Sequence, residues 1–133
     1  MLVTLVVAVS LIGGGLISCT QGASGVASYK IGLVAAQSGQ YAGLGTQAIQ
    51  GAQLLVDKIN DGGGIDGIPV ELVIYDDKSE ATEAALAVKK LVEVDKVHVV
   101  AAGDATTITQ SLPPLINELE VPGTGISGTS LLD

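Results

Sequence analysis

Short apolar runs alternate with amphipathic stretches beyond residue 28. Residues 30–36 (KIGLVAA) form a nearly continuous apolar run, which is typical of a buried parallel strand. Residues 46–60 then repeat apolar side chains at helical spacing, with Ile49, Ala52, Val56 and Ile59 on one face. The alternation continues, and it predicts further strands over 68–75, 97–102 and 121–126 and further helices over 79–94 and 106–119.

Glycine and proline divide these elements. Gly62-Gly63-Gly64 follows the first predicted helix and precedes the second predicted strand, so it is interpreted as a turn that caps the helix. Pro113-Pro114 lies inside the third predicted helix and must break or kink it, because proline lacks a backbone N–H. The second and third helices are expected to place these side chains in the core: Ala81, Ala84, Ala85, Val88, Leu91, Val92, Leu112, Leu115, Ile116 and Leu119.

Strand and helix alternating in this way predict an α/β fold, a doubly wound parallel sheet with right-handed crossovers and helices on both faces. If the strand order is 2-1-3-4, the chain reverses direction between the first and third strands, and ligands bind in the crevice at such a switch point. The loops that would meet there are residues 36–45, 103–107 and 127–130. Their small hydroxyl-bearing residues favour an anionic group such as a carboxylate, although ordinary helix capping would select the same residue types.

The first eighteen residues predict an export signal. Residues 2–18 carry no charge and are mostly apolar, and the run is slightly shorter than the about 20 residues that a membrane span needs. Residues 1–18 are therefore expected to be a lipoprotein signal peptide, the alternative being an uncleaved membrane anchor. Leu16-Ile17-Ser18-Cys19 resembles a lipobox, so Cys19 is expected to be acylated and to hold the protein at the membrane, unless it stays a free thiol. Residues 19–28, rich in Gly, Ser and Ala, predict a flexible tether.

Charge and composition exclude several functions. Fourteen acidic residues stand against six lysines, so nucleic acid is not an expected partner. The acidic residues after the second strand (Asp76, Asp77, Glu80 and Glu83) lack the spacing of a calcium loop and suit a helix start, and no metal site is expected there. His98 is the single histidine, and no set of nucleophile, base and orienting residue is present. The sequence therefore predicts neither a cofactor nor an enzyme.

A combination of motifs carries a family resemblance. The first strand is followed by S-G-x-Y-A-x-x-G, then by G-A-x-L-x-V-x-x-I-N and G-G-I-x-G-x-P-V-E-L, and the second strand ends in Asp76-Asp77. This pattern resembles the N-terminal lobe of type 1 periplasmic binding proteins, in particular the branched-chain amino acid-binding components of ABC transporters. The resemblance covers residues 29–133, which are expected to form part of that lobe. It implies an extracytoplasmic protein that binds an amino acid and works with ABC permease and ATPase subunits.

The resemblance also implies a ligand site. Ser38 and Tyr41 would lie in the first wall of the cleft, and Ala105 and Thr106 would contact the carboxylate of the ligand. Ser127, Gly128, Thr129 and Ser130 would present a carbonyl and a hydroxyl to its ammonium group. Ala105 lacks a hydroxyl that many relatives have, and Asp104 either caps the third helix or adds a negative charge beside the carboxylate position.

Two other interpretations stay open at the level of the sequence. A ligand-binding domain of a sensory receptor would have the same fold and would require a following membrane helix and signalling module. A non-functional gene fragment is the other, because members of the family that the chain resembles are more than twice as long. The sequence does not identify the solute, since the family takes several amino acids and amides.

Overall fold

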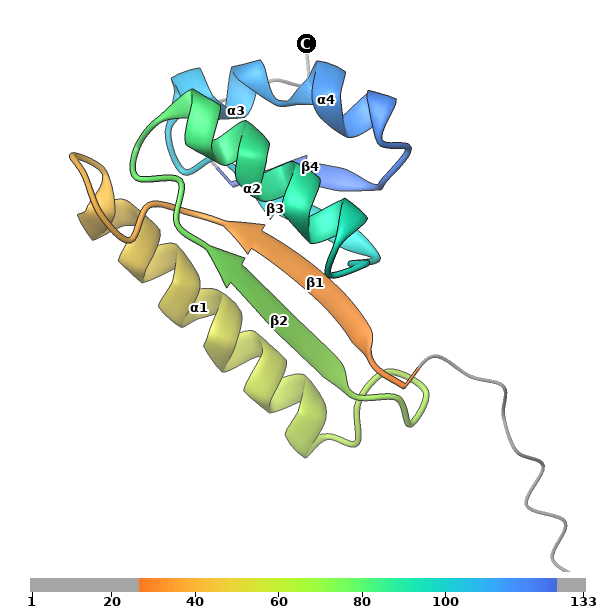
Figure 1. The fold of residues 1–133 in the computed structure, drawn as a ribbon. Coiled ribbons are helices and arrows are strands. Elements are labelled where there is room, and N and C mark those ends of the chain that lie inside the picture. Colours follow the sequence, from red (N-terminus) through yellow and green to blue (C-terminus); the bar gives the residue numbers. More distant parts are fainter. Residues whose placement is uncertain (1–26, 127–133) are drawn as a thin grey trace, which may run out of the picture.

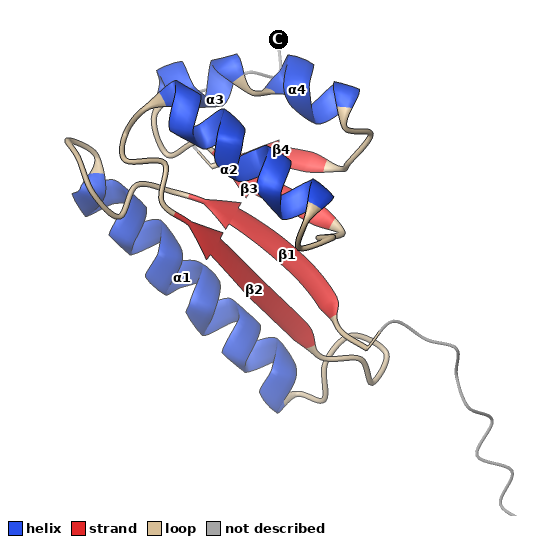
Figure 2. Cartoon of the chain, in the orientation of Figure 1, coloured by secondary structure: helices blue, strands red, loops and turns tan. Residues whose placement is uncertain are grey.

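Four parallel strands with helices on both faces make up the fold in a computed structural model that describes residues 27–126 (Figures 1 and 2). In chain order the elements are β1 (Tyr29–Val34), α1 (Ala42–Asp61), β2 (Val70–Tyr75), α2 (Ala81–Glu93), β3 (Val99–Ala102), α3 (Thr106–Ser111), α4 (Pro113–Glu118) and β4 (Gly123–Gly125). The strand order is β2-β1-β3-β4, and every neighbouring pair is parallel. The predicted doubly wound α/β sheet and its strand order are therefore confirmed.

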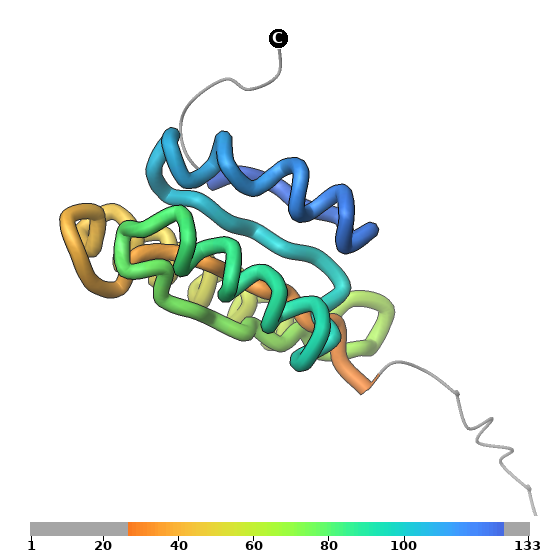
Figure 3. Tube along the Cα trace, turned by 45° about the horizontal axis from the view of Figure 1, so that its top comes forward, coloured from red at the N-terminus to blue at the C-terminus, as the bar shows by residue number. Residues whose placement is uncertain are grey.

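The main core lies between the sheet and α2. Ala84, Val88 and Leu91 of α2 are fully buried, and they pack with Val34 and Val100 from the two central strands. Figures 1 and 3 show α2 and the α3–α4 pair on one side of the sheet and α1 on the other. The apolar faces predicted for the helices are confirmed, because these side chains are buried or half-buried: Ile49, Ala52, Val56, Ile59, Ala81, Ala85, Val92, Leu112, Leu115, Ile116 and Leu119.

The first helix begins earlier than the sequence predicted. It starts at Ala42 rather than at residue 46, and the backbone N–H groups of Leu44 and Gly45 both donate to the carbonyl of Tyr41. Apolar periodicity could not reveal this turn, because it contains two glycines. Gly45 is buried against Ala36, and a Cβ at this position would overlap the Ala36 carbonyl. The glycine therefore allows the start of α1 to lie directly on the chain that leaves β1.

Two other boundaries differ for local reasons. β2 begins at Val70 and not at residue 68, because Ile68 pairs with Ile65 inside the turn. The Asn60 side chain donates to the Val70 carbonyl and accepts from the Val70 N–H, at 2.9 and 2.8 Å, and so joins the end of α1 to the start of β2. β3 begins two residues later than predicted and β4 is shorter than predicted.

The proline pair divides the third helical segment as predicted. α3 ends at Ser111, α4 begins at Pro113, and buried Leu112 lies between them. The predicted turn at Gly62-Gly63-Gly64 is also present, with Gly63 and Gly64 in the left-handed region at φ of 97° and 79°. Within residues 27–126, no helix is long and apolar enough to span a membrane. The predicted signal, Cys19 and most of the predicted tether lie outside the described residues.

Candidate functional site

The loops that follow β1, β2 and β3 meet at the carboxyl edge of the sheet, as the strand order requires. The Ala35 N–H donates to the Tyr75 carbonyl at 3.2 Å, and the Gly103 N–H donates to the Val34 carbonyl at 3.2 Å. These bonds continue the sheet pairing beyond the ends of the strands. The loops lie over the switch point between β1 and β3, which is the predicted place for a ligand.

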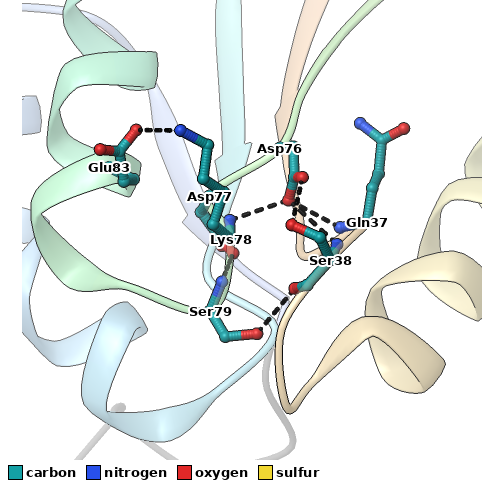
Figure 4. A network of polar contacts seen from close by, with 7 residues as sticks. All are labelled: Gln37, Ser38, Asp76, Asp77, Lys78, Ser79 and Glu83. Atoms are coloured by element: carbon teal, nitrogen blue, oxygen red, sulfur yellow. Dashed lines mark hydrogen bonds and ion pairs between the residues drawn. The ribbon is translucent and has the colours of Figure 1, made fainter.

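Asp76 fastens the β1–α1 loop to the end of β2 (Figure 4). Its Oδ1 accepts the backbone N–H groups of Gln37 at 2.8 Å, Ser38 at 3.3 Å and Lys78 at 2.8 Å. Its Oδ2 accepts the Ser38 hydroxyl at 2.7 Å. Both carboxylate oxygens are therefore used to hold the protein together.

Ser79 makes a second connection between the same two loops. Its hydroxyl donates to the Ser38 carbonyl at 2.9 Å and accepts the Tyr41 N–H at 3.0 Å. Lys78 and Ser79 both have left-handed backbone conformations, with φ of 53° and 65°, which costs a non-glycine residue about 1–2 kcal/mol. The carboxylates of Asp76 and Asp77 compensate by accepting the N–H groups of these two residues, each at 2.8 Å.

Asp104 connects the third loop. Its Oδ2 accepts the Ala36 N–H at 2.8 Å. The residue before α3 is Ala105, and no side chain caps that helix start. The interpretation of Asp104 as a cap of the third helix was therefore wrong, and its carboxylate instead fixes the end of β1. The sequence could not indicate this bond, because its partners are 68 residues apart.

The loop after β3 is shaped by Gly103 and Thr109. Gly103 has a left-handed φ of 84°, and a Cβ there would lie 2.6 Å from the Thr109 hydroxyl. That buried hydroxyl donates to the Gly103 carbonyl at 2.7 Å and to the Ala105 carbonyl at 3.1 Å. The backbone that leads into Thr106 is thereby held in one conformation.

The two neighbouring aspartates have opposite electrostatic environments. Burial alone would raise the pKa of Asp76, but its bonds from Ser38, Lys78 and Gln37 outweigh this and lower it. The pKa of Asp77 is raised, chiefly by burial. The hydrogen bond from Ser79 lowers this pKa, whereas the nearby carboxylates of Asp104 and Asp76 raise it. Asp77 is fully buried, and its Oδ2 has no hydrogen-bond partner.

The structure brings together four of the predicted site residues. Ser38 is exposed in the β1–α1 loop, and Tyr41 is half-buried at the start of α1, where it packs against the core. Ala105 is buried, and Thr106 is partly exposed as the first residue of α3. The other four predicted residues, Ser127, Gly128, Thr129 and Ser130, lie outside the described residues.

Sequence reasoning missed the residues that organise the crevice. It interpreted Asp76 and Asp77 as acids at a helix start, whereas Asp76 and Ser79 bind the preceding loop. The available signal was their position directly after β2, which pairs with β1 and so brings the two loops together. In the described part of the chain, no group of three or more histidine, cysteine or acidic side chains could hold a metal ion.

Comparison with known proteins places this geometry among solute-binding proteins. A family model described as periplasmic binding protein matches residues 28–132. A Leu/Ile/Val-binding protein of Rhizobium johnstonii is 42% identical over 66 residues, which are 50% of this chain and 18% of that protein.

Two solved structures share the fold at appreciable identity. The branched-chain amino acid transporter substrate-binding protein LivJ of Streptococcus pneumoniae, solved in complex with isoleucine, is 39% identical with a TM-score of 0.72, over 75% of this chain and 29% of that one. A leucine-binding protein of Thermotoga maritima is 26% identical with a TM-score of 0.65, over 74% of this chain and 27% of that one. The chain therefore spans less than a third of the length of each of these relatives.

Proposed function

Because the chain belongs to the periplasmic binding protein family, we propose that it forms part of an extracytoplasmic solute-binding component of an ABC transporter for branched-chain or related amino acids. The observation that carries the proposal is the 39% identity to a protein solved with isoleucine, over 75% of this chain. The fold and the switch point between β1 and β3 are consistent with that role. The proposed role is binding, because the family whose model matches the chain is one of binding proteins.

In the proposed mechanism the crevice supplies one wall of the solute site. Such a wall needs polar groups that are held in place before the ligand arrives, because ordering them on binding would reduce affinity. Three connections provide this rigidity: Asp76 to Ser38, Ser79 to Ser38 and Asp104 to Ala36. They hold the β1–α1 loop against the loops after β2 and β3.

We assign the ligand contacts to the residues predicted from the resemblance. Ala105 and Thr106 would meet the carboxylate of the amino acid, with Ser38 and Tyr41 in the adjoining wall. The segment with Ser127, Gly128, Thr129 and Ser130 would meet its ammonium group. Asp104 is held in place by the Ala36 N–H, which donates to its Oδ2, and its Oδ1 is buried.

The proposal includes the predicted location and partners. Residues 1–18 would be the export signal, Cys19 the acylated residue, residues 19–28 the tether and residues 29–133 part of the first lobe. The loaded protein would deliver its amino acid to ABC permease and ATPase subunits. The acidic charge balance, fourteen acidic residues against six lysines, suits a soluble extracytoplasmic domain and offers no surface for nucleic acid.

An NMR titration tests the binding assignment even if the affinity is weak. Isoleucine added to the isotope-labelled chain should shift the amide signals of residues 36–45 and 103–107. The turn at residues 62–67 lies at the opposite edge of the sheet, so its signals should not move and they serve as the internal control. D-Isoleucine should give much smaller shifts, because its charged groups cannot meet the same partners.

Two results would reject the assignment. Shifts of equal size at the 62–67 turn would indicate non-specific association. An unchanged spectrum at millimolar isoleucine would show that the crevice has no affinity for the amino acid, since even a 1 mM dissociation constant corresponds to only about −4 kcal/mol.

A further inference from the structure

Two buried carboxylate oxygens in the loops at the carboxyl edge of the sheet have no hydrogen-bond partner. They are Asp77 Oδ2, in the loop after β2, and Asp104 Oδ1, in the loop after β3, and less than 1 Å² of each is exposed. The other oxygen of each carboxyl is satisfied, by the Ser79 N–H and the Ala36 N–H respectively. Two carboxyl groups therefore each present one unpaired, buried oxygen, and they interact electrostatically.

Leaving both groups ionised would be energetically unfavourable. A buried charge without a partner costs several kcal/mol in general, and like charges close together raise this cost. Asp76 beside Asp77 is a third negative charge, and the exposed Lys78 is paired with Glu83 at 3.2 Å. The β1–α1 loop, residues 35–41, contains no charged residue, and neither do Thr106 and Thr107 at the start of α3. Lys90 of α2 lies over the Tyr75 ring, and among the described residues no cation is a hydrogen-bond partner of either unpaired oxygen.

The room beside the two oxygens determines which partner could neutralise their negative charge. A water molecule or a metal ion that touched these oxygens would need room beside them, and less than 1 Å² of accessible surface on each leaves none. A proton needs no such room and fits there, and we propose that the Asp77 carboxyl holds one in the folded protein, and that loss of this proton beside Asp104 weakens the packing of the loops after β2 and β3 over the end of β1.

The direction of the pH effect follows from proton linkage. The raised pKa of Asp77 means that the folded protein binds more protons than the unfolded chain above the ordinary aspartate value of about 3.9. Stability contributed by this pair is therefore complete below that value and declines as the pH rises through the folded-state pKa. The inference concerns the lobe itself and holds whichever solute the crevice accepts.

Urea unfolding of the full chain across pH tests the inference. Asp77→Asn removes the titration while its amide oxygen still accepts the Ser79 N–H. The quantity to compare is the ratio of the unfolding equilibrium constant of wild type to that of Asp77→Asn. Between about pH 4 and pH 7 this ratio should rise with pH, by at most about tenfold per pH unit for one proton. Asp61→Asn, which replaces an exposed acid at the end of α1, is the matched control for the removal of one carboxyl group.

Asp104→Asn supplies a second test if the first variant folds poorly. Its amide oxygen can still accept the Ala36 N–H, and the substitution removes one of the two like charges that act on Asp77, so it should also gain stability over wild type as the pH rises. In infrared spectra, wild type at about pH 6 should show the carbonyl stretch of a protonated carboxyl, and Asp77→Asn should lack it. A ratio that stays constant with pH for both variants, or no such band in wild type, would overturn the proposal.

Discussion

Replacing Asp76 by alanine should destabilise the protein more than its partial exposure suggests. The substitution removes the acceptor of four hydrogen bonds, from the Gln37 N–H, the Ser38 N–H, the Ser38 hydroxyl and the Lys78 N–H. It also leaves Lys78 in a left-handed conformation, at φ of 53°, without the bond that compensates for it. The Ser79 hydroxyl and the backbone bond from Ala35 to Tyr75 would then remain as connections between the β1–α1 loop and the end of β2.

The magnitude can be worked from these contacts. A hydrogen bond to a charged group contributes about 1.5–3 kcal/mol, but Gln37, Ser38 and Lys78 are exposed, so water can replace much of what is lost. A total loss of about 2–3 kcal/mol is therefore expected for Asp76→Ala. Asp76→Asn keeps one side-chain oxygen as acceptor for the three N–H groups, loses the acceptor of the Ser38 hydroxyl, and should lose about 1 kcal/mol.

Urea unfolding at pH 7, compared with Asp61→Ala at an exposed position, measures this loss. The lowered pKa of Asp76 adds a signature, because stability from a lowered carboxyl pKa is present above the unfolded value of about 3.9 and disappears as the pH falls through the folded value. The difference between wild type and Asp76→Asn should therefore shrink below about pH 4. A loss under about 0.5 kcal/mol for Asp76→Ala, equal to a typical surface substitution, would refute the reasoning.

Three other substitutions test separate parts of the interpretation. Gly45→Ala should lower the free energy of unfolding by about 1–3 kcal/mol, because the new Cβ overlaps the Ala36 carbonyl. Its control, Gly51→Ala, has open space around the new Cβ and should raise the free energy of unfolding by about 0.5–1 kcal/mol. In a full-length protein with both lobes, Thr106→Ala should weaken amino acid binding by about 1–3 kcal/mol if its hydroxyl contacts the carboxylate, and unchanged calorimetric affinity would reject that contact. Cys19→Ser should abolish fatty-acid labelling and membrane retention, and retention without label would indicate an uncleaved helix.

The fold could be predicted because its signals are local. Apolar runs such as residues 30–36 and helical faces such as Ala84, Val88 and Leu91 depend only on sequence spacing, and Pro113 breaks a helix wherever it occurs. The start of α1 could not be located, because its first turn contains glycines whose role depends on contact with Ala36. Periodicity contains no information about such a contact.

The crevice was predictable in position but not in detail. Strand alternation located the three loops, and the motif around Ser38 and Tyr41 indicated the first wall. The bonds that organise it join partners 38 residues apart for Asp76 and Ser38, and 68 apart for Asp104 and Ala36. Aspartate after a strand suits a helix start equally well, so only the placement of β1 between β2 and β3 distinguishes the two roles.

Asp76 and Asp77 are neighbours in the sequence, but their pKa values shift in opposite directions. Successive residues leaving a strand point in opposite directions, so one carboxylate faces the exposed β1–α1 loop and collects N–H and O–H donors, while the other turns into the core. The lowered pKa of Asp76 stabilises the folded protein at pH values above that pKa. The raised pKa of Asp77 makes folding less favourable as the pH increases. The first effect lowers the stability of these loops as the pH falls, and the second lowers it as the pH rises. Asp76 binds the β1–α1 loop directly, whereas Asp77 accepts the N–H of Ser79, whose hydroxyl binds the same loop, so the rigidity of this loop depends on both carboxyl groups.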